Sequence, residues 1–86
     1  MARTIYKYAL TLDPAQNLAL PFDSEGLTVQ LQKGVPTLWA IVDPDHKLVP
    51  RRVYCLPTGG DGPAPQWEYL GTVQMQHDGT VWHFFS

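Results

Sequence analysis

The amino-acid sequence predicts an all-β protein. Eight prolines are spread along its 86 residues and interrupt most stretches that are long enough for a helix. No apolar stripe with helical spacing extends beyond two turns, and the segments between the prolines are short and rich in β-branched and aromatic residues. We therefore expect one domain over residues 1–86, an antiparallel meander of roughly six to seven short strands that closes as a small sandwich or partial barrel.

The first strand is expected over Thr4–Leu12, where every second residue lies on one face. The next four residues, Asp13–Gln16, suit a type I turn because Asp and Pro hold its first two positions. A single helical turn from Pro14 is the competing interpretation. Asn17–Leu20 would then return as the second strand, and Pro21–Gly26 would follow as a loop.

The middle of the chain holds two further strands. Leu27–Gln32 alternates regularly, which predicts that Leu27, Val29 and Leu31 point into the core. Thr37–Val42 is apolar on both faces, and such a strand belongs in the middle of a sheet. Turns are expected at Lys33–Gly34 and at Asp43–His46.

The next strand, Lys47–Leu56, is interrupted by Pro50, which cannot donate a hydrogen bond to a neighbour and so marks an edge or a bulge. Pro57–Gln66 is the longest stretch without strand character, and a long loop in a small domain is often functional. Trp67–Gln76 alternates again. Asp78–Gly79 is a strong two-residue hairpin signal before the last strand, Val81–Phe85.

Two of these strands are apolar on both faces, whereas one face is enough to fill the core of a single curled sheet. Exposing Trp39, Trp82 and Phe84 would cost a small domain much of its stability, since burying each ring is worth about 2–3 kcal/mol. We therefore expect a homo-oligomer built from dimers, with Trp82, His83 and Phe84 at the interface. The alternative is that all these rings fit into one core.

Composition limits the classes of partner. The net charge is −2, with six basic and eight acidic residues, so a nucleic-acid partner is not expected. Cys55 is the one cysteine, which excludes an internal disulfide. The first residues, Met1–Thr4, contain no apolar run of a signal peptide, and no segment is apolar enough for a membrane span. We expect a cytoplasmic protein without a membrane partner.

The strongest candidate site is a basic strand end that runs into a glycine-rich loop. Arg51 and Arg52 can each bind phosphate through paired hydrogen bonds. Thr58, Gly59 and Gly60 follow, and glycines allow successive backbone N–H groups to turn toward one anion. The alternative is that the arginines lie on a solvated face and the glycines only connect strands.

Stacking residues for a base are expected near the N-terminus and on the two-faced strand. Tyr6, Lys7 and Tyr8 place two rings beside an ammonium group, and Trp39 and Trp67 offer flat surfaces. The alternative is that Tyr6 and Tyr8 share one strand face and simply pack against the core.

Catalytic chemistry is not indicated. The histidines, His46, His77 and His83, fit no zinc spacing, and the aspartates occupy turn positions. No Ser/His/Asp or Cys/His set is marked by its sequence context. We therefore expect no metal, no cofactor and no enzyme activity.

The chain resembles a family of small, largely uncharacterised proteins encoded by tailed bacteriophages and their prophages. The motifs that carry this resemblance are Thr4–Tyr8, Gly34–Asp43, Arg52, Thr58–Gly59, Tyr69–Gln74 and Val81–Phe85. Relatives often read Gly-Thr-Gly-His in the loop, where this chain reads Pro57–Gly62. The resemblance implies a phage origin, and small phage proteins that oligomerise include inhibitors of bacterial defence.

We therefore expect a counter-defence protein of the host cytoplasm that binds and sequesters a nucleotide-type immune signal, a cyclic oligonucleotide or an ADP-ribose derivative. Sequestration needs no catalytic residue, which suits the groups that are missing. The alternatives are an inhibitor that docks on a host defence enzyme by strand addition or an aromatic patch, and an accessory protein of virion assembly. A small hydrolase of the same signal is the enzymatic rival.

Overall fold

The computed structural model describes residues 2–86, and over this range the protein is all-β with no helix, as the sequence predicts. No segment of this range is a helix that could cross a membrane. Seven strands form two antiparallel sheets. The strands are β1 (Thr4–Ala9), β2 (Ala15–Pro21), β3 (Glu25–Gln32), β4 (Val35–Val42), β5 (Leu48–Pro57), β6 (Tyr69–Gln74) and β7 (Val81–Phe85).

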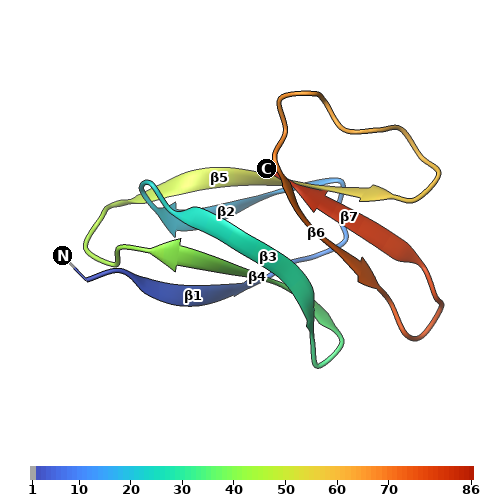
Figure 1. Ribbon diagram of the computed structural model, residues 1–86, viewed down its shortest axis with the longest axis horizontal. Helices are drawn as coiled ribbons and strands as arrows, with labels where there is room; N and C mark the ends of the chain where they lie inside the picture. Colours follow the sequence, from blue (N-terminus) through green and yellow to red (C-terminus); the bar gives the residue numbers. More distant parts are fainter. Residues whose placement is uncertain (1) are drawn as a thin grey trace.

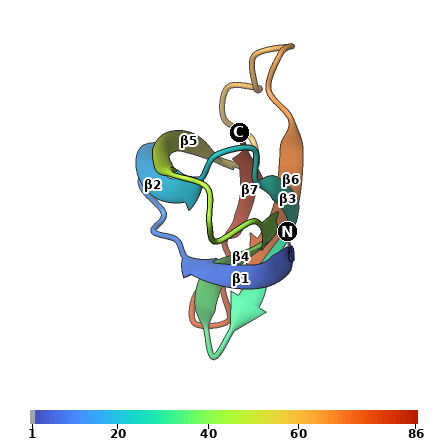
Figure 2. The same ribbon diagram turned by 90° about the vertical axis from the view of Figure 1, so that its left-hand side faces the viewer.

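The strands are divided between a three-stranded sheet in the order β1-β4-β3 and a four-stranded sheet in the order β2-β5-β7-β6 (Figure 1). The two sheets pack as a small sandwich. At one side β3 and β6 lie against each other, as the view in Figure 2 shows. The segment between β5 and β6, residues 58–68, arches away from the sheets.

The expected meander is wrong, because most strands do not pair with their neighbours in sequence. The only consecutive strands that pair are β3 with β4 and β6 with β7, whereas β1 pairs with β4 and β2 with β5. The segment between β1 and β2 crosses from one sheet to the other. Within it, the Gln16 side chain donates to the Thr11 carbonyl at 2.9 Å and accepts from the Thr11 amide at 3.0 Å. This side chain occupies the backbone groups that a hairpin ladder would use.

The core lies between the inner faces of the two sheets. Because side chains alternate along a strand, every second residue contributes to it. The buried residues that form its central cluster are Leu10, Val29, Leu38, Val53, Cys55, Leu70, Val73, Met75 and Phe84. Phe84 has no exposed surface, so the last strand is anchored in the middle of this cluster.

The two clearest strand predictions have different outcomes. β4 is the central strand of its sheet, as expected from its two apolar faces. In β3, Val29 is buried as predicted, but Leu27 is 44% exposed instead of pointing inward. The register of β3 against β4 shifts between Gly26 and Thr28, and the extra residue takes Leu27 out of the alternation.

The turn predicted at Lys33–Gly34 and the edge position of Pro50 are confirmed. The last hairpin has a longer turn than the two residues predicted, because the Met75 amide donates to the Thr80 carbonyl, and β2 begins within the turn predicted at Asp13–Gln16. Lys33 and Gly34 both have positive φ, which a tight hairpin turn requires, and Gly79 of the last hairpin has a φ of 71°. β5 pairs with β2 from Leu48 to Tyr54, whereas β7 pairs only with the end of β5, from Tyr54 onward. Pro50 therefore lies where β5 has a neighbour on one side only.

The contact between β3 and β6 depends on a glycine. A Cβ atom built on Gly71 would lie 2.5 Å from the carbonyl oxygen and 2.7 Å from the nitrogen of Val29. Any side chain at this position would push the two strands apart, because the obstacle is rigid backbone.

Replacing this glycine tests how closely the sheets are held together. We expect Gly71→Ala to lower the free energy of unfolding by at least about 2–3 kcal/mol, because the added methyl group cannot be accommodated without moving β3. Urea denaturation measures the change. Gly62→Ala is the matched control, since a Cβ there meets nothing within 4 Å. Equal stability of the two variants would contradict the tight crossing.

Burial raises the pKa of the Cys55 thiol from 9.0 to about 11, and the carboxyl group of Asp13 adds to the shift. The folded state thus holds this proton more tightly than the unfolded state. The contribution of the protonated thiol to the free energy of unfolding is complete below pH 9 and is lost as the pH rises toward 11. Two pKa units correspond to about 2–3 kcal/mol.

We therefore expect the free energy of unfolding to fall between pH 9 and 11, and Cys55→Ala to make this decline shallower by about 2–3 kcal/mol. Denaturant titrations at several pH values in this range check the expectation. The pKa of the partly buried Tyr8 is also raised, so this residue too makes the free energy of unfolding fall as the pH rises. That part of the decline is the same in the wild type and in the Cys55→Ala variant. An unchanged slope in the variant would show that the thiol is not protected in the folded state.

Candidate functional site

The two neighbouring arginines point to opposite faces of the four-stranded sheet. Arg51 is half-buried on the inner face with Val53, whereas Arg52 is exposed on the outer face with Tyr54. The expectation that both arginines bind one phosphate-bearing ligand is therefore wrong. The alternation of side chains in a strand separates them.

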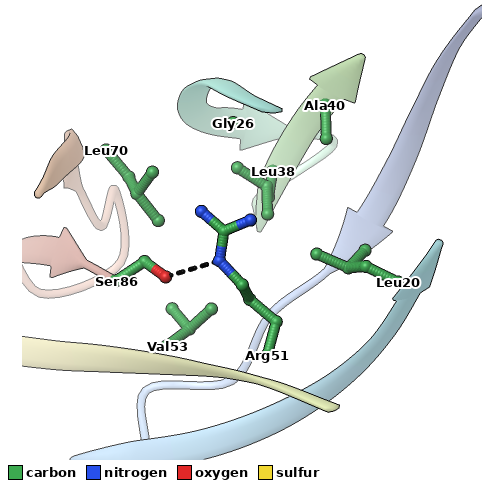
Figure 3. Close-up of a pocket in the computed structure, with 8 residues that line it drawn as sticks. All are labelled: Leu20, Gly26, Leu38, Ala40, Arg51, Val53, Leu70 and Ser86. Carbon is green, nitrogen blue, oxygen red and sulfur yellow. Dashed lines mark hydrogen bonds between the residues drawn. The ribbon is translucent and has the colours of Figure 1, made fainter. Parts of the chain in front are cut away.

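Arg51 is used inside the protein. Its Nε donates to the Ser86 hydroxyl at 2.9 Å, and its Nη1 donates to the Ser24 carbonyl oxygen at 2.9 Å. Figure 3 shows the guanidinium among apolar side chains that include Leu38 and Leu70. The space left beside it does not admit a water molecule. Arg51 thus ties the turn after β2 to the end of the chain and has no room for a ligand.

The predicted stacking residues near the N-terminus do not form one site. Cross-strand register places Lys7 beside Trp39 on the outer face of the three-stranded sheet, and Lys7 Nζ donates to the Gln32 side chain at 2.8 Å. Tyr6 and Tyr8 lie on the other face, where Tyr8 packs against the core. All four residues belong to the sheet that does not carry the glycine-rich loop.

The glycine-rich loop begins with a tight turn. The Gly60 amide donates to the Pro57 carbonyl at 3.3 Å, and Gly59 between them has a φ of 88°, which fits the third position of a type II turn. The Thr58 amide donates to the Val81 carbonyl at 3.2 Å and holds the loop against β7. Thr58, Gly59 and Gly60 therefore form one turn that is held beside β7.

A shallow hollow of about 240 Å³ lies between this loop and the end of β7. We call it the loop hollow. It is lined by Leu56, residues 57–63 of the loop, His83 and Phe85. His83 was expected at an oligomer interface, and the structure places it in the wall of this hollow. Asp61, which the sequence predicts in a turn, is the acidic residue of the lining.

A continuous chain of hydrogen-bonding side chains starts in the wall of the loop hollow, at Thr58 and His83, and continues onto β6. Thr58 Oγ1 lies 2.6 Å from His83 Nε2, and the other ring nitrogen, Nδ1, lies 2.9 Å from Thr72 Oγ1. Thr72 Oγ1 in turn lies 2.6 Å from the Tyr69 hydroxyl. A neutral imidazole donates from one nitrogen and accepts at the other, so the two threonines satisfy both.

An aromatic cluster borders the loop hollow on the outer face of the four-stranded sheet. Trp67 stacks on Tyr54 with ring centroids 3.8 Å apart and planes 7° apart. The centroid of the Phe85 ring lies 6.3 Å from that of Trp67, in a tilted arrangement, and 5.7 Å from that of Tyr69, in an edge-on arrangement. Of these four rings, only Trp67 was considered from the sequence, as a flat surface. Strand alternation could have indicated two of the other rings. Tyr54 and Phe85 directly adjoin the core residues Cys55 and Phe84 in sequence, so they must lie on the outer face of the sheet.

The predicted interface residues are mostly occupied within the chain. Phe84 is fully buried in the core, so it offers no surface to a partner. Trp82 packs against the same core, and its Nε1 donates to the Thr80 hydroxyl at 2.9 Å. Only His83 of the three faces outward. The alternative interpretation, that these rings fit into one core, holds for Trp82 and Phe84.

Other reactive groups contribute little to this face. Cys55 is buried, and its pKa of about 11 keeps it a neutral thiol at physiological pH. Residues 2–86 contain no group of three or more His, Cys, Asp or Glu side chains that could hold a metal ion. The loop hollow therefore offers hydroxyl, imidazole and backbone groups beside aromatic rings, which is chemistry suited to binding.

Comparison with known proteins places the whole chain in one family. A family model described as "Domain of unknown function (DUF7352)" matches residues 1–86, and the chain belongs to this family. No curated protein and no solved structure matches it.

The different roles of the two arginines can be measured. We expect Arg51→Ala to lower the free energy of unfolding by about 2–3 kcal/mol, since it removes two charge-assisted hydrogen bonds and the packing of the side-chain stem. Arg52→Ala, on the exposed face, should change it by no more than about 0.5 kcal/mol. Thermal and urea denaturation of both variants check this. Similar losses for the two would contradict the assignment of Arg51 to the interior.

Proposed function

We propose that this member of the DUF7352 family is a phage counter-defence protein that binds a nucleotide-type immune signal in the loop hollow and sequesters it. The signal would be a cyclic oligonucleotide or an ADP-ribose derivative, and the protein would act as a homo-oligomer in the host cytoplasm. The observation that carries this proposal is the convergence of Thr58, Gly59, Gly60 and His83 beside an aromatic cluster. The resemblance to small tailed-phage proteins supports the biological setting.

The phosphate end of such a ligand would face the loop. Hydroxyl and backbone N–H groups are donors that bind phosphate oxygens, and Thr58 and the turn at Gly59 present both kinds within one hollow, with His83 hydrogen-bonded to the Thr58 hydroxyl behind it. Each replaces part of the hydration shell that the phosphate loses on binding. This cluster takes the place of the paired arginines expected from the sequence.

The sugar and the base would lie toward the aromatic side. Asp61 in the lining can accept hydrogen bonds from ribose hydroxyls, a role that carboxylates take in many nucleotide sites. A bare phosphate would instead be repelled by it. Trp67 already stacks on Tyr54, so the free face of this pair offers a rigid platform for a base. The acid and the rings together favour a nucleotide over inorganic phosphate.

Arg52 would contact a more distant charge of the ligand. It lies on the same face as Tyr54 and Leu56 and precedes Leu56 by four residues, which is about 13 Å along the strand. Its long side chain can therefore reach a second phosphate beyond the aromatic cluster. Cyclic oligonucleotides and ADP-ribose derivatives both carry more than one phosphate, which supports these ligand classes.

Oligomerisation would close the site. The loop hollow is shallow and open to solvent, so a small ligand would remain exposed on one side. A second protomer placed over the outer face of the four-stranded sheet would enclose it. The low content of charged residues, 16% of the chain, is consistent with a surface that is covered in the assembly.

A protein-binding inhibitor is the second candidate, and a different surface favours it. The outer face of the three-stranded sheet carries the half-buried Trp39, with Ile5 57% and Val35 43% exposed. The neighbouring β1 has one unpaired edge, which is available for strand addition. A host defence enzyme or a virion component would bind there and leave the loop hollow empty.

Native mass spectrometry tests the proposed function directly. We expect a discrete oligomer that gains the mass of a cyclic dinucleotide, a cyclic trinucleotide or an ADP-ribose derivative when mixed with a panel of these compounds. Thr58→Val should lower the affinity at least about tenfold, since it removes a hydrogen bond to a charged group. Lys7→Ala, on the other sheet, is the matched control and should bind as the wild type does. An oligomer with no mass gain across the panel would favour the protein-binding inhibitor.

A further inference from the structure

We infer that Tyr69, Thr72 and His83 form a hydrogen-bond relay that orients the hydroxyl proton of Thr58 toward an anionic group in the loop hollow. Tyr69 and Thr72 would thus be positioning residues that act on a ligand without touching its phosphate. This inference rests on the proposed function and names how the site would select its anion.

The relay is built from adjacent elements on one face. Tyr69 and Thr72 lie on β6, His83 lies opposite Thr72 on β7, and Thr58 follows the end of β5. The contacts of His83 with Thr58 and of Thr72 with Tyr69 each measure 2.6 Å, and that of His83 with Thr72 measures 2.9 Å, so all three are within hydrogen-bond distance. Because His83 uses both ring nitrogens in these contacts, its proton position is coupled to the orientation of both threonines.

Three arrangements of protons satisfy the whole chain when the imidazole is neutral, and only one of them has the proton of His83 on Nε2. In the first, Tyr69 donates to Thr72, Thr72 donates to His83 Nδ1, and His83 Nε2–H donates to Thr58. The Thr58 hydroxyl proton then points out of the relay and into the hollow. In the other two, His83 Nδ1–H donates to Thr72, and Thr58 donates to Nε2 and so presents only lone pairs to the hollow. These two differ only in whether Tyr69 or Thr72 is the donor in the contact between them.

A phosphate in the loop hollow would select the first arrangement, because an anion needs a donor and is repelled by lone pairs. Each bond in the chain polarises the next, so the far end contributes to the strength of the final contact. Tyr69 is 58% exposed, and water can satisfy its hydroxyl in each arrangement. The relay can therefore reverse without leaving a buried group unpaired.

Substitutions at the far end separate this relay from a merely structural role. Thr72→Val keeps the shape of the side chain but removes the link between Tyr69 and His83. Thr72→Ser restores the hydroxyl and should restore the function. Tyr69→Phe removes only the terminal donor and keeps the ring that contacts Phe85.

The test uses adenosine 5′-monophosphate and adenosine as probes, which differ only in the phosphate. By isothermal titration calorimetry, we expect Thr72→Val to weaken binding of adenosine 5′-monophosphate about tenfold and to leave adenosine unchanged. Tyr69→Phe should give a smaller loss of the same selectivity, and Thr72→Ser should bind as the wild type does. Equal effects on both probes, or failure of Thr72→Ser to restore binding, would overturn the relay.

Nitrogen-15 NMR of histidine-labelled protein reads the relay independently of affinity. With adenosine 5′-monophosphate bound, the proton of His83 should lie on Nε2, with Nδ1 unprotonated, and Thr72→Val should remove this preference. A proton on Nδ1 in the bound state would overturn the inference while leaving the proposed function intact. Absence of binding by the wild type to both the monophosphate and the ligand panel would instead overturn the proposed function, and the relay with it.

Discussion

The close crossing of β3 and β6 is the constraint on which the arrangement of the sheets depends. At Gly71 the backbone of β6 lies directly against Val29 of β3, with no space for even a methyl group. This contact joins one edge of the three-stranded sheet to one edge of the four-stranded sheet. It places β6 and its hairpin partner β7 over the core, where Phe84 is buried. The outward residues of these two strands, which include Thr72 and His83, are positioned as a consequence.

Local signals in the sequence were sufficient to predict the strands but not their pairing. Alternation, proline placement and the Lys33–Gly34 and Asp78–Gly79 turns gave the all-β class, the central β4 and the long loop, because each depends on neighbouring residues. Pairing depends on contacts that are distant in sequence. The crossing between β1 and β2 is held by the Gln16 side chain, and the bulge that exposes Leu27 is a register shift against β4. In a single sequence, the crossing between β1 and β2 looks like a hairpin, and the bulge at Leu27 looks like a regular strand.

The candidate site was predictable in part for the same reason. Thr58, Gly59 and Gly60 were identified because glycine spacing is a local signal. The opposite orientation of Arg51 and Arg52, and of Tyr6 and Lys7, follows from the two-residue period of a strand, so strand assignment alone already argued against joining them in one site. The contact of His83 with Thr58 could not be predicted, since it requires the pairing of β5 with β7.

The position of the loop hollow follows from unequal strand lengths. β5 has ten residues, of which the first seven pair with β2 and the last four with β7, sharing Tyr54. Outward side chains of β5, β6 and β7 lie side by side only along Tyr54–Pro57, the part of β5 that pairs with β7. The loop leaves β5 at the end of this part. Hydroxyls, an imidazole and aromatic rings are concentrated here, whereas the opposite face of the sheet is filled by core residues. A surface that served only to connect strands would not need His83 held at both nitrogens, so this arrangement supports the ligand site that we propose at the end of β5.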